Sequence, residues 1–251
     1  MNTTELVNYL NELLNVENCA DAAYNGLQVG NGDAEIEKVA FAVDACLEAF
    51  QQAAQAGAQL LVVHHGLMWN KFGAIVGISY KRIKYLLDNN LALYSAHLPM
   101  DLHAEFGHNA QLAELIGLQK LERFGEYRNQ MIGFSGQLPD PLPFSEFCRQ
   151  FEKINQGQLA VVASGKEIVR SVGILSGGGA MSHLEASEKG IDVLITGETS
   201  HSAYHLIKES GVNVIFAGHY HSEKPGLHAL RKHIERKFRL KTLFLNIPTG
   251  F

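Results

Sequence analysis

Three stretches of this sequence place histidines close to each other or to carboxylates, and these residue types are metal ligands. The stretches are His64 with His65, His97 with Asp101, and His219 with Glu223. In the last two, the carboxylate follows the histidine by four residues. Mixed nitrogen and oxygen ligands without thiolate suit Zn, Mn, Fe or Ni and do not select among them. For any one stretch taken alone, ordinary histidines in a turn are the alternative.

The number of candidate ligands predicts a centre with two metal ions. The expected ligands are His64, His65, Asp101, His219 and Glu223. Three imidazoles and two carboxylates exceed what one four-coordinate ion with an open position takes. They suit two divalent ions ~3.5–4 Å apart, as in two-metal hydrolases. The positive charge left on such a centre lowers the pKa of water and attracts phosphate, so we expect a small anionic substrate.

The apolar run before the paired histidines predicts a buried strand. Residues 60–63 are all apolar and follow a helical stretch over 45–57, which is typical of an α/β unit. The carboxyl ends of such strands are where ligands bind in open α/β sheets. Adjacent residues on a strand point to opposite sides, so His64 and His65 serve one site only if the turn rotates one of them. Otherwise each histidine holds a different ion. Asp44, after a predicted strand over 39–43, is expected to cap the helix that follows.

An internal repeat organises the chain. A shift of 133 residues places 60–63 on 193–196 and His65 on Glu198. A shift of 122 residues places 93–97 on 215–219 and Asp101 on Glu223. The prediction is an α/β fold of two regions built from duplicated strand-helix units, with the metal site at the strand ends between them.

The predicted domain division follows the distribution of the candidate ligands. Residues 1–125 with 220–251 form the first region and carry most of the ligands, and residues 126–219 form the second. Within the second region we expect a strand over 131–138, a turn at Asp140–Pro141 and a helix over 144–154.

Composition excludes several classes of protein. With 251 residues, 46% hydrophobic and 19% charged, the chain is typical of a globular protein that can bury a sizeable core. The net charge of −5 argues against broad nucleic-acid binding. We expect neither a signal peptide nor a membrane span, since the first residues lack a basic stretch before a long apolar run and no later run is long enough to cross a membrane. The three cysteines lie far apart without a CxxC pair, so we expect reduced thiols in a cytoplasmic protein.

The combined motifs resemble a known family. They are Val63-His64-His65-Gly66, Ala96-His97-Leu98-Pro99-Met100-Asp101 and Gly218-His219-Tyr220-His221-Ser222-Glu223, with supporting similarity at 25–30 and 192–198. Over essentially its whole length, the sequence is similar to the YbgI-like (Nif-three-like) family, whose members are often labelled GTP cyclohydrolase I type II homologues. The resemblance implies two α/β regions, the same five ligands on a dinuclear metal centre, and toroidal hexamers with the metal sites facing the interior.

Several other residues have two interpretations. His97 and Glu198 are the expected catalytic residues, which would move protons beside the metals. A packed strand-end histidine is the alternative for His97, and a helix cap or a partner of a ligand is the alternative for Glu198. His201 and His205 lie in the same stretch as Glu198, and His221 either reaches the substrate or is solvated. Surface positions are expected for four more histidines: His103, His108, His228 and His233.

The glycine-rich stretch at 176–179 could hold a phosphate on its backbone amides, or it could be a tight strand-to-helix turn. It lacks the GK[ST] of a P-loop, and no GxSxG elbow occurs elsewhere. We therefore expect neither a P-loop nor a serine hydrolase, and no organic cofactor.

The leading prediction is a dinuclear metal-dependent hydrolase that acts on a small nucleotide-like or phosphate-bearing substrate. Opening of the imidazole ring of GTP is one candidate reaction, from the family label. The alternatives are a metal-binding regulatory or metal-delivery protein without turnover, and an interaction scaffold held together by its metals.

Overall fold

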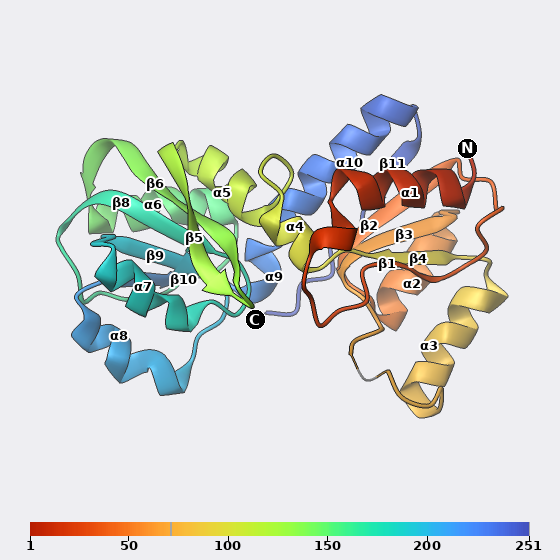
Figure 1. Ribbon diagram of the computed structural model, residues 1–251, viewed down its shortest axis with the longest axis horizontal. Coiled ribbons are helices and arrows are strands. Elements are labelled where there is room, and N and C mark those ends of the chain that lie inside the picture. The colour runs from red at the N-terminus through yellow and green to blue at the C-terminus, as the bar shows by residue number, and fades with distance from the viewer. Residues whose placement is uncertain (71, 251) are drawn as a thin grey trace. The chain divides into compact units, whose positions relative to one another are not determined.

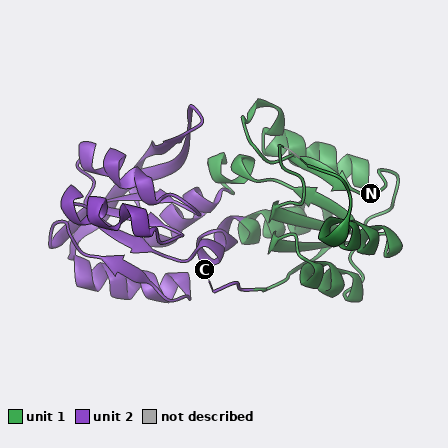
Figure 2. Ribbon diagram, turned by 90° about the horizontal axis from the view of Figure 1, so that it is seen from below, with its two compact units in different colours: residues 1–106, 227–247 green, residues 107–226, 248–251 purple. Residues whose placement is uncertain are grey.

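The chain divides into two compact units. The computed structural model describes residues 1–70 and 72–250, so Lys71 and Phe251, which fall in the predicted first region, lie outside the described residues. Unit 1 consists of residues 1–106 and 227–247, and unit 2 consists of residues 107–226 and the end of the chain from 248 (Figure 2). Whether the folding domains follow the bounds predicted from the sequence, 1–125 with 220–251 and 126–219, stays a prediction.

Unit 1 is built on a five-stranded mixed sheet in the order β1-β4-β3-β2-β11. Strands β2, β3, β4 and β11 are parallel, and β1 pairs with β4 in the antiparallel sense. The elements are α1 (Thr3–Leu13), the 3₁₀ turn η1 (Val16–Asn18), β1 (Gly26–Val29), β2 (Lys38–Asp44), α2 (Leu47–Gln55), β3 (Leu60–His65), α3 (Gly77–Asp88), β4 (Ala92–Ser95), α4 (Leu98–Leu102), α10 (Lys224–Phe238) and β11 (Lys241–Phe244). The first three residues of α10 are assigned to unit 2 and the rest of the helix to unit 1.

Helices cover both faces of this sheet. Figure 1 shows α2 and α3 on one side of the sheet and α1 and α10 on the other. Alternate strand residues, among them Leu61 and Val63, pack against Phe50 of α2 and Leu86 of α3. Both faces of β3 are buried, so packing on both sides holds the strand in place. The prediction of a buried strand leading to His64 and His65 is therefore confirmed.

Unit 2 is built on a six-stranded mixed sheet in the order β5-β6-β8-β9-β10-β7. Strands β8, β9 and β10 are parallel, and the other pairings are antiparallel. The elements are α5 (His108–Ile116), β5 (Gln119–Tyr127), β6 (Gln130–Pro143), α6 (Phe144–Asn155), β7 (Ala160–Val162), β8 (Ile168–Leu175), the 3₁₀ turn η2 (Ala180–Ser182), α7 (His183–Glu188), β9 (Val193–Thr196), the 3₁₀ turn η3 (His201–Ala203), α8 (Tyr204–Ser210), β10 (Asn213–Phe216) and α9 (His219–Ser222).

The antiparallel edge of unit 2 differs from the sequence prediction. β6 continues through Asp140–Pro141, where a turn was expected, although its pairing with β8 shifts register between Gln137 and Leu142. The prolines are tolerated because the ladder is interrupted there. β5 was not predicted, since most of its residues are exposed and show no apolar alternation.

The predicted repeat is present, with one correction. The order β2-α2-β3-α3-β4 recurs as β8-α7-β9-α8-β10, and β2 pairs with β3 in the same register as β8 with β9 after the shift of 133 residues. In the third strand, Ala96 donates to Val63 O as Ala217 donates to Thr196 O, which is a shift of 121 residues. The predicted shift of 122 residues was therefore wrong within this strand. Unit 2 has one extra residue between this strand and His219, and Gly218, whose φ is +83°, provides the bend.

No helix within the described residues is both long enough and apolar enough to cross a membrane.

Candidate metal centre

His64 and His65 lie together at the end of β3. His64 is fully buried, and its Nδ1 donates to the carbonyl of Ala96 just after β4, at 3.1 Å. The two ring centroids are 4.5 Å apart with an angle of 53° between the planes. The alternation expected of an extended strand does not separate them, so both imidazoles can serve one site.

His65 is oriented by Asp44, which ends the neighbouring strand β2. The two residues are paired across the sheet, and His65 Nδ1 lies 2.9 Å from Asp44 Oδ1. The prediction that Asp44 caps α2 was wrong. The N-cap is Cys46, whose Sγ accepts from the amide of Ala49 at 3.4 Å.

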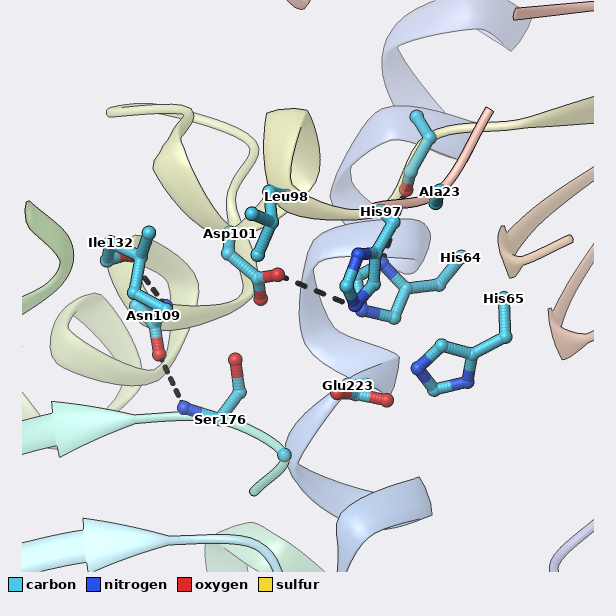
Figure 3. A network of polar contacts seen from close by, with 12 residues as sticks. Ala23, His64, His65, His97, Leu98, Asp101, Asn109, Ile132, Ser176 and Glu223 are labelled. Atoms are coloured by element: carbon cyan, nitrogen blue, oxygen red, sulfur yellow. Dashed lines mark hydrogen bonds and ion pairs between the residues drawn. The ribbon is translucent and has the colours of Figure 1, made fainter. Parts of the chain in front are cut away.

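His97 joins the two histidines of β3. Its ring centroid is 5.0 Å from that of His64 and 5.6 Å from that of His65, and one ring nitrogen of each of the three lies within 4.8 Å of the others. Asp101, on the short helix α4, places Oδ2 3.7 Å from His64 Nε2 (Figure 3). Unit 1 therefore gathers three imidazoles and one carboxylate.

Asp21 orients His97 and was missed by the sequence analysis. His97 Nδ1 lies 3.0 Å from Asp21 Oδ1, and the amide of Leu98 donates to Asp21 Oδ2 at 3.0 Å. Burial alone raises the pKa of Asp21, but the hydrogen bonds from His97 and Asn25 outweigh burial and hold that pKa well below its usual range. Asp21 is therefore a carboxylate that stabilises the Nδ1–H form of His97.

Unit 2 contributes a second set around His219. His219 Nδ1 lies 2.6 Å from Glu198 Oε1, and His219 Nε2 lies 3.0 Å from Glu223 Oε1. Burial lowers the pKa of His219, but the two carboxylates outweigh burial and raise it to about 9. Glu223 is nearly fully buried. The two carboxylates stabilise a positive charge beside them, which is either that of protonated His219 or that of a metal ion.

The four histidines share one hydrogen-bonding arrangement, and it fits metal binding. In each of them Nδ1 faces an oxygen that can accept a hydrogen bond: Ala96 O for His64, Asp44 for His65, Asp21 for His97 and Glu198 for His219. A carbonyl or carboxylate oxygen only accepts, so Nδ1 carries the proton and the lone pair of the neutral ring is on Nε2. Histidine ligands in metal sites typically have this arrangement, because the outer acceptor fixes the tautomer and ring orientation.

Other residues singled out in the sequence have different surroundings. The prediction of a surface position for His108 was wrong, since it is fully buried at the start of α5. His201 and His205 are exposed, and His205 packs edge-on against Tyr204. His221 is partly buried beside Gly157, and burial lowers its pKa.

The glycine-rich stretch after β8 is a tight turn. Its amides already have protein acceptors: Ser176 N donates to Asn109 Oδ1 at 2.7 Å (Figure 3), Gly177 N to Ser222 Oγ and Gly179 N to Thr196 Oγ1. These donors are not available to a phosphate, which excludes a phosphate cradle formed by them.

Comparison with known proteins gives consistent matches over the whole chain. The model of the family described as Duf34/NIF3 (NGG1p interacting factor 3) matches residues 1–249. The chain is 45% identical to a "GTP cyclohydrolase 1 type 2 homolog" of Archaeoglobus fulgidus and 41% identical to one of Pyrococcus abyssi, each over 100% of both chains.

Solved structures match in the same way. The chain superposes on protein ybgI, whose function is given as unknown, with a TM-score of 0.93 and 34% identity over 100% of both chains. It superposes on TTHA1606 from Thermus thermophilus with a TM-score of 0.91 and 35% identity, also over 100% of both chains.

Proposed function

Because this chain belongs to the Duf34/NIF3 family, we propose that it is a dinuclear metal-dependent hydrolase acting on a small nucleotide-like or phosphate-bearing substrate. The observation that carries the proposal is the shared arrangement of the four histidines, each with Nδ1 held by an oxygen acceptor and its lone pair on Nε2.

We assign the metal ligands to both units. They are His64, His65 and Asp101 of unit 1 with His219 and Glu223 of unit 2. When bound, two divalent ions of Zn, Mn, Fe or Ni supply the charge that activates water and attracts an anionic substrate. Within each unit the donors are already oriented by hydrogen bonds, so ordering them adds little to the free-energy cost of binding.

Two further residues have supporting roles in this proposal. His97, with Asp21 fixing its Nδ1–H, presents Nε2 as the atom that accepts and returns a proton during hydrolysis. Glu198 acts as a positioning residue through His219, since its carboxylate faces His219 Nδ1. That geometry supports the interpretation of Glu198 as a partner of a ligand over that of a general base.

The name of the relatives suggests a specific reaction to test. Opening of the guanine imidazole ring of GTP is one candidate for this chain, alongside hydrolysis of phosphate esters. The expected cytoplasmic location, supported by three free cysteines, and the expected homohexamer remain part of the proposal. Light scattering on the purified protein tests the hexamer.

The decisive experiment combines elemental analysis with a substrate screen on the same sample. We expect about two divalent ions per chain after loosely bound metal is removed, and turnover of at least one nucleotide or phosphoester. The double variant His64→Ala/His65→Ala should lose both, while His205→Ala, at an exposed histidine, should keep both. At most one ion per chain would contradict the dinuclear centre. Two ions without turnover of any compound would favour a metal-delivery or regulatory protein.

A further inference from the structure

A small cavity lies beside the histidines of unit 1. It has a volume of about 260 Å³ and lies between the segment after β3 and the helix α3. Gly66, the residue after His65, forms part of its wall, together with Trp69, Phe72, Ser79 and Arg82. Ligand pockets in proteins usually measure about 300–1,000 Å³, so this cavity suits part of a small molecule.

Trp69 connects the cavity to the histidines. Its ring centroid lies 4.9 Å from that of His97, edge to face, and 6.4 Å from that of His65. Its indole Nε1 donates to the carbonyl of Gly66 at 3.1 Å, which fixes the ring orientation. Trp69 therefore borders both the cavity and the two imidazoles.

Two aromatic side chains in the cavity wall are accessible to solvent. Trp69 is 38% exposed and Phe72 is 37% exposed. Large aromatic side chains have a large apolar area, so a ligand that covers them gains free energy from that burial. Planar rings stack favourably on such side chains.

Arg82 gives the cavity a positive charge. It is half-buried on α3, and within the described part of the chain it forms no hydrogen bond or ion pair. Lys84, two residues along the same helix, is by contrast paired with Asp88 at 2.7 Å. A guanidinium presents several donors in one plane and binds phosphate or carboxylate strongly, and the hydroxyl of Ser79 is a further donor in the same wall.

We propose that this cavity binds a nucleotide-like molecule, with the planar ring stacked on Trp69 and Phe72 and one phosphate held by Arg82 and Ser79. Binding in the cavity needs no metal. The further statement that the bound molecule is the substrate rests on the proposed hydrolase function, and Trp69, which lies beside both the cavity and the imidazoles of His65 and His97, supports it.

The test uses the fluorescence of Trp69, which is the only tryptophan of the chain. Adenosine 5′-monophosphate and adenosine are titrated into the protein as purified and again after metal removal. We expect saturable quenching by both compounds with and without metal, and tighter binding of the monophosphate. Failure of both compounds to quench at millimolar concentration would overturn the proposal.

Matched variants separate the two contacts. Arg82→Gln should weaken binding of the monophosphate by about tenfold or more, leaving it no tighter than adenosine, because a charge-assisted hydrogen bond is lost. Lys84→Gln removes one positive charge from the same helix outside the cavity and should change nothing. Phe72→Leu should weaken both compounds by roughly fivefold or more, because a stacking surface is lost. An unchanged affinity of Arg82→Gln for the monophosphate would overturn the proposal.

Failure of the cavity proposal is distinguishable from failure of the hydrolase proposal. Arg82-dependent binding in a protein without turnover would support the cavity and contradict the hydrolase. Turnover with a KM that Arg82→Gln and Phe72→Leu leave unchanged would support the hydrolase and contradict the cavity.

Discussion

Units 1 and 2 share three parallel strands in the same order, yet the equivalent strand ends carry different chemistry. His65 at the end of β3 corresponds to Glu198 after β9, and Asp44 at the end of β2 corresponds to Gly177 after β8. In unit 1 the carboxylate of Asp44 orients the imidazole of His65. In unit 2 the residue that corresponds to His65 is Glu198, which is itself the orienting carboxylate. The imidazole that it orients belongs to His219, which follows β10. The duplicated backbone therefore provides equivalent strand ends in the two units, and the residue type at each strand end determines whether it can bind a metal ion or orient a ligand.

The histidines that look most alike in sequence are not equivalent in the backbone. His97 lies two residues after β4, as the N-cap of α4, whereas His219 lies three residues after β10, past the bend at Gly218. Accordingly their Nδ1 atoms have partners from different parts of the fold, Asp21 before β1 and Glu198 after β9. We infer different roles, with His219 as a ligand and His97 as a proton carrier.

The largest expected effect distinguishes the carboxylates of the two units. Glu223→Gln should remove both metals, because the longer side chain is nearly fully buried beside His219 and can bridge two ions. Asp101→Asn should mainly weaken one metal. Elemental analysis of both variants after dialysis measures this, and equal loss of metal would contradict the assigned difference.

The next comparison concerns His97 and His219. His219→Ala should lose metal, whereas His97→Ala should retain it and lose about 10²–10⁴-fold in turnover, the usual contribution of a positioned proton carrier. Metal content and activity are measured on the same samples. Loss of metal from His97→Ala would make it a ligand, and full activity with metal retained would make it a structural neighbour.

The orienting carboxylates should have intermediate effects. Asp44→Ala and Glu198→Ala each remove the partner of one Nδ1, and such changes typically weaken metal affinity by about 10–100-fold. Asp44 should have the larger effect, since its side chain is 37% exposed and that of Glu198 is 53% exposed. Metal competition with a chelating dye measures both, and wild-type affinity in both variants would exclude the orienting role.

Replacing Gly177 tests why unit 2 has a glycine at the position that corresponds to Asp44 of unit 1. A Cβ on Gly177 would lie 2.6 Å from Glu223 Oε1, and φ there is +66°. Gly177→Ala should reduce the free energy of unfolding by about 1–2 kcal/mol and also weaken metal binding several-fold. The matched control is Gly190→Ala, with φ +67° and open space around the position. It should lose similar stability but retain metal affinity, and equal metal affinities of the two variants would contradict the contact with Glu223.

The last prediction is a pH dependence of stability in unit 2. In the metal-free protein the pKa of His219 is about 9, above the usual ~6.5 of histidine. The stabilisation from protonated His219 is therefore complete below pH ~6.5 and is lost as pH rises through about 9. The denaturation midpoint of the metal-free protein should fall over this window. In His219→Gln the denaturation midpoint should fall less over this pH window, because the titrating imidazole is absent. An identical fall in the variant would contradict the assignment of this pH dependence to His219.

Much of the fold was predictable because each buried strand leaves a continuous apolar run in the sequence. The strand leading to His64 and His65, and the recurrence of β2 and β3 as β8 and β9, follow from such runs. Strand β5 could not be predicted, since an exposed antiparallel strand at an edge needs no apolar pattern. The predicted shift at β10 was wrong by one residue, because shifts of 121 and of 122 residues both place apolar residues on apolar residues. Only the backbone hydrogen bonds of Ala96 and Ala217 distinguish the two shifts.

For the candidate site, the sequence by itself determined which residue types follow the strands and that they suit metal ions. Only the tertiary structure decided their partners. His97 meets Asp21 across 76 residues of chain and His64 meets Ala96 across 32, and no local spacing encodes such pairs. Chain spacing specifies side chains along one strand, whereas hydrogen bonds between strand ends depend on which strands are neighbours and in what register. The orientation of the imidazoles is therefore a property of the folded sheets.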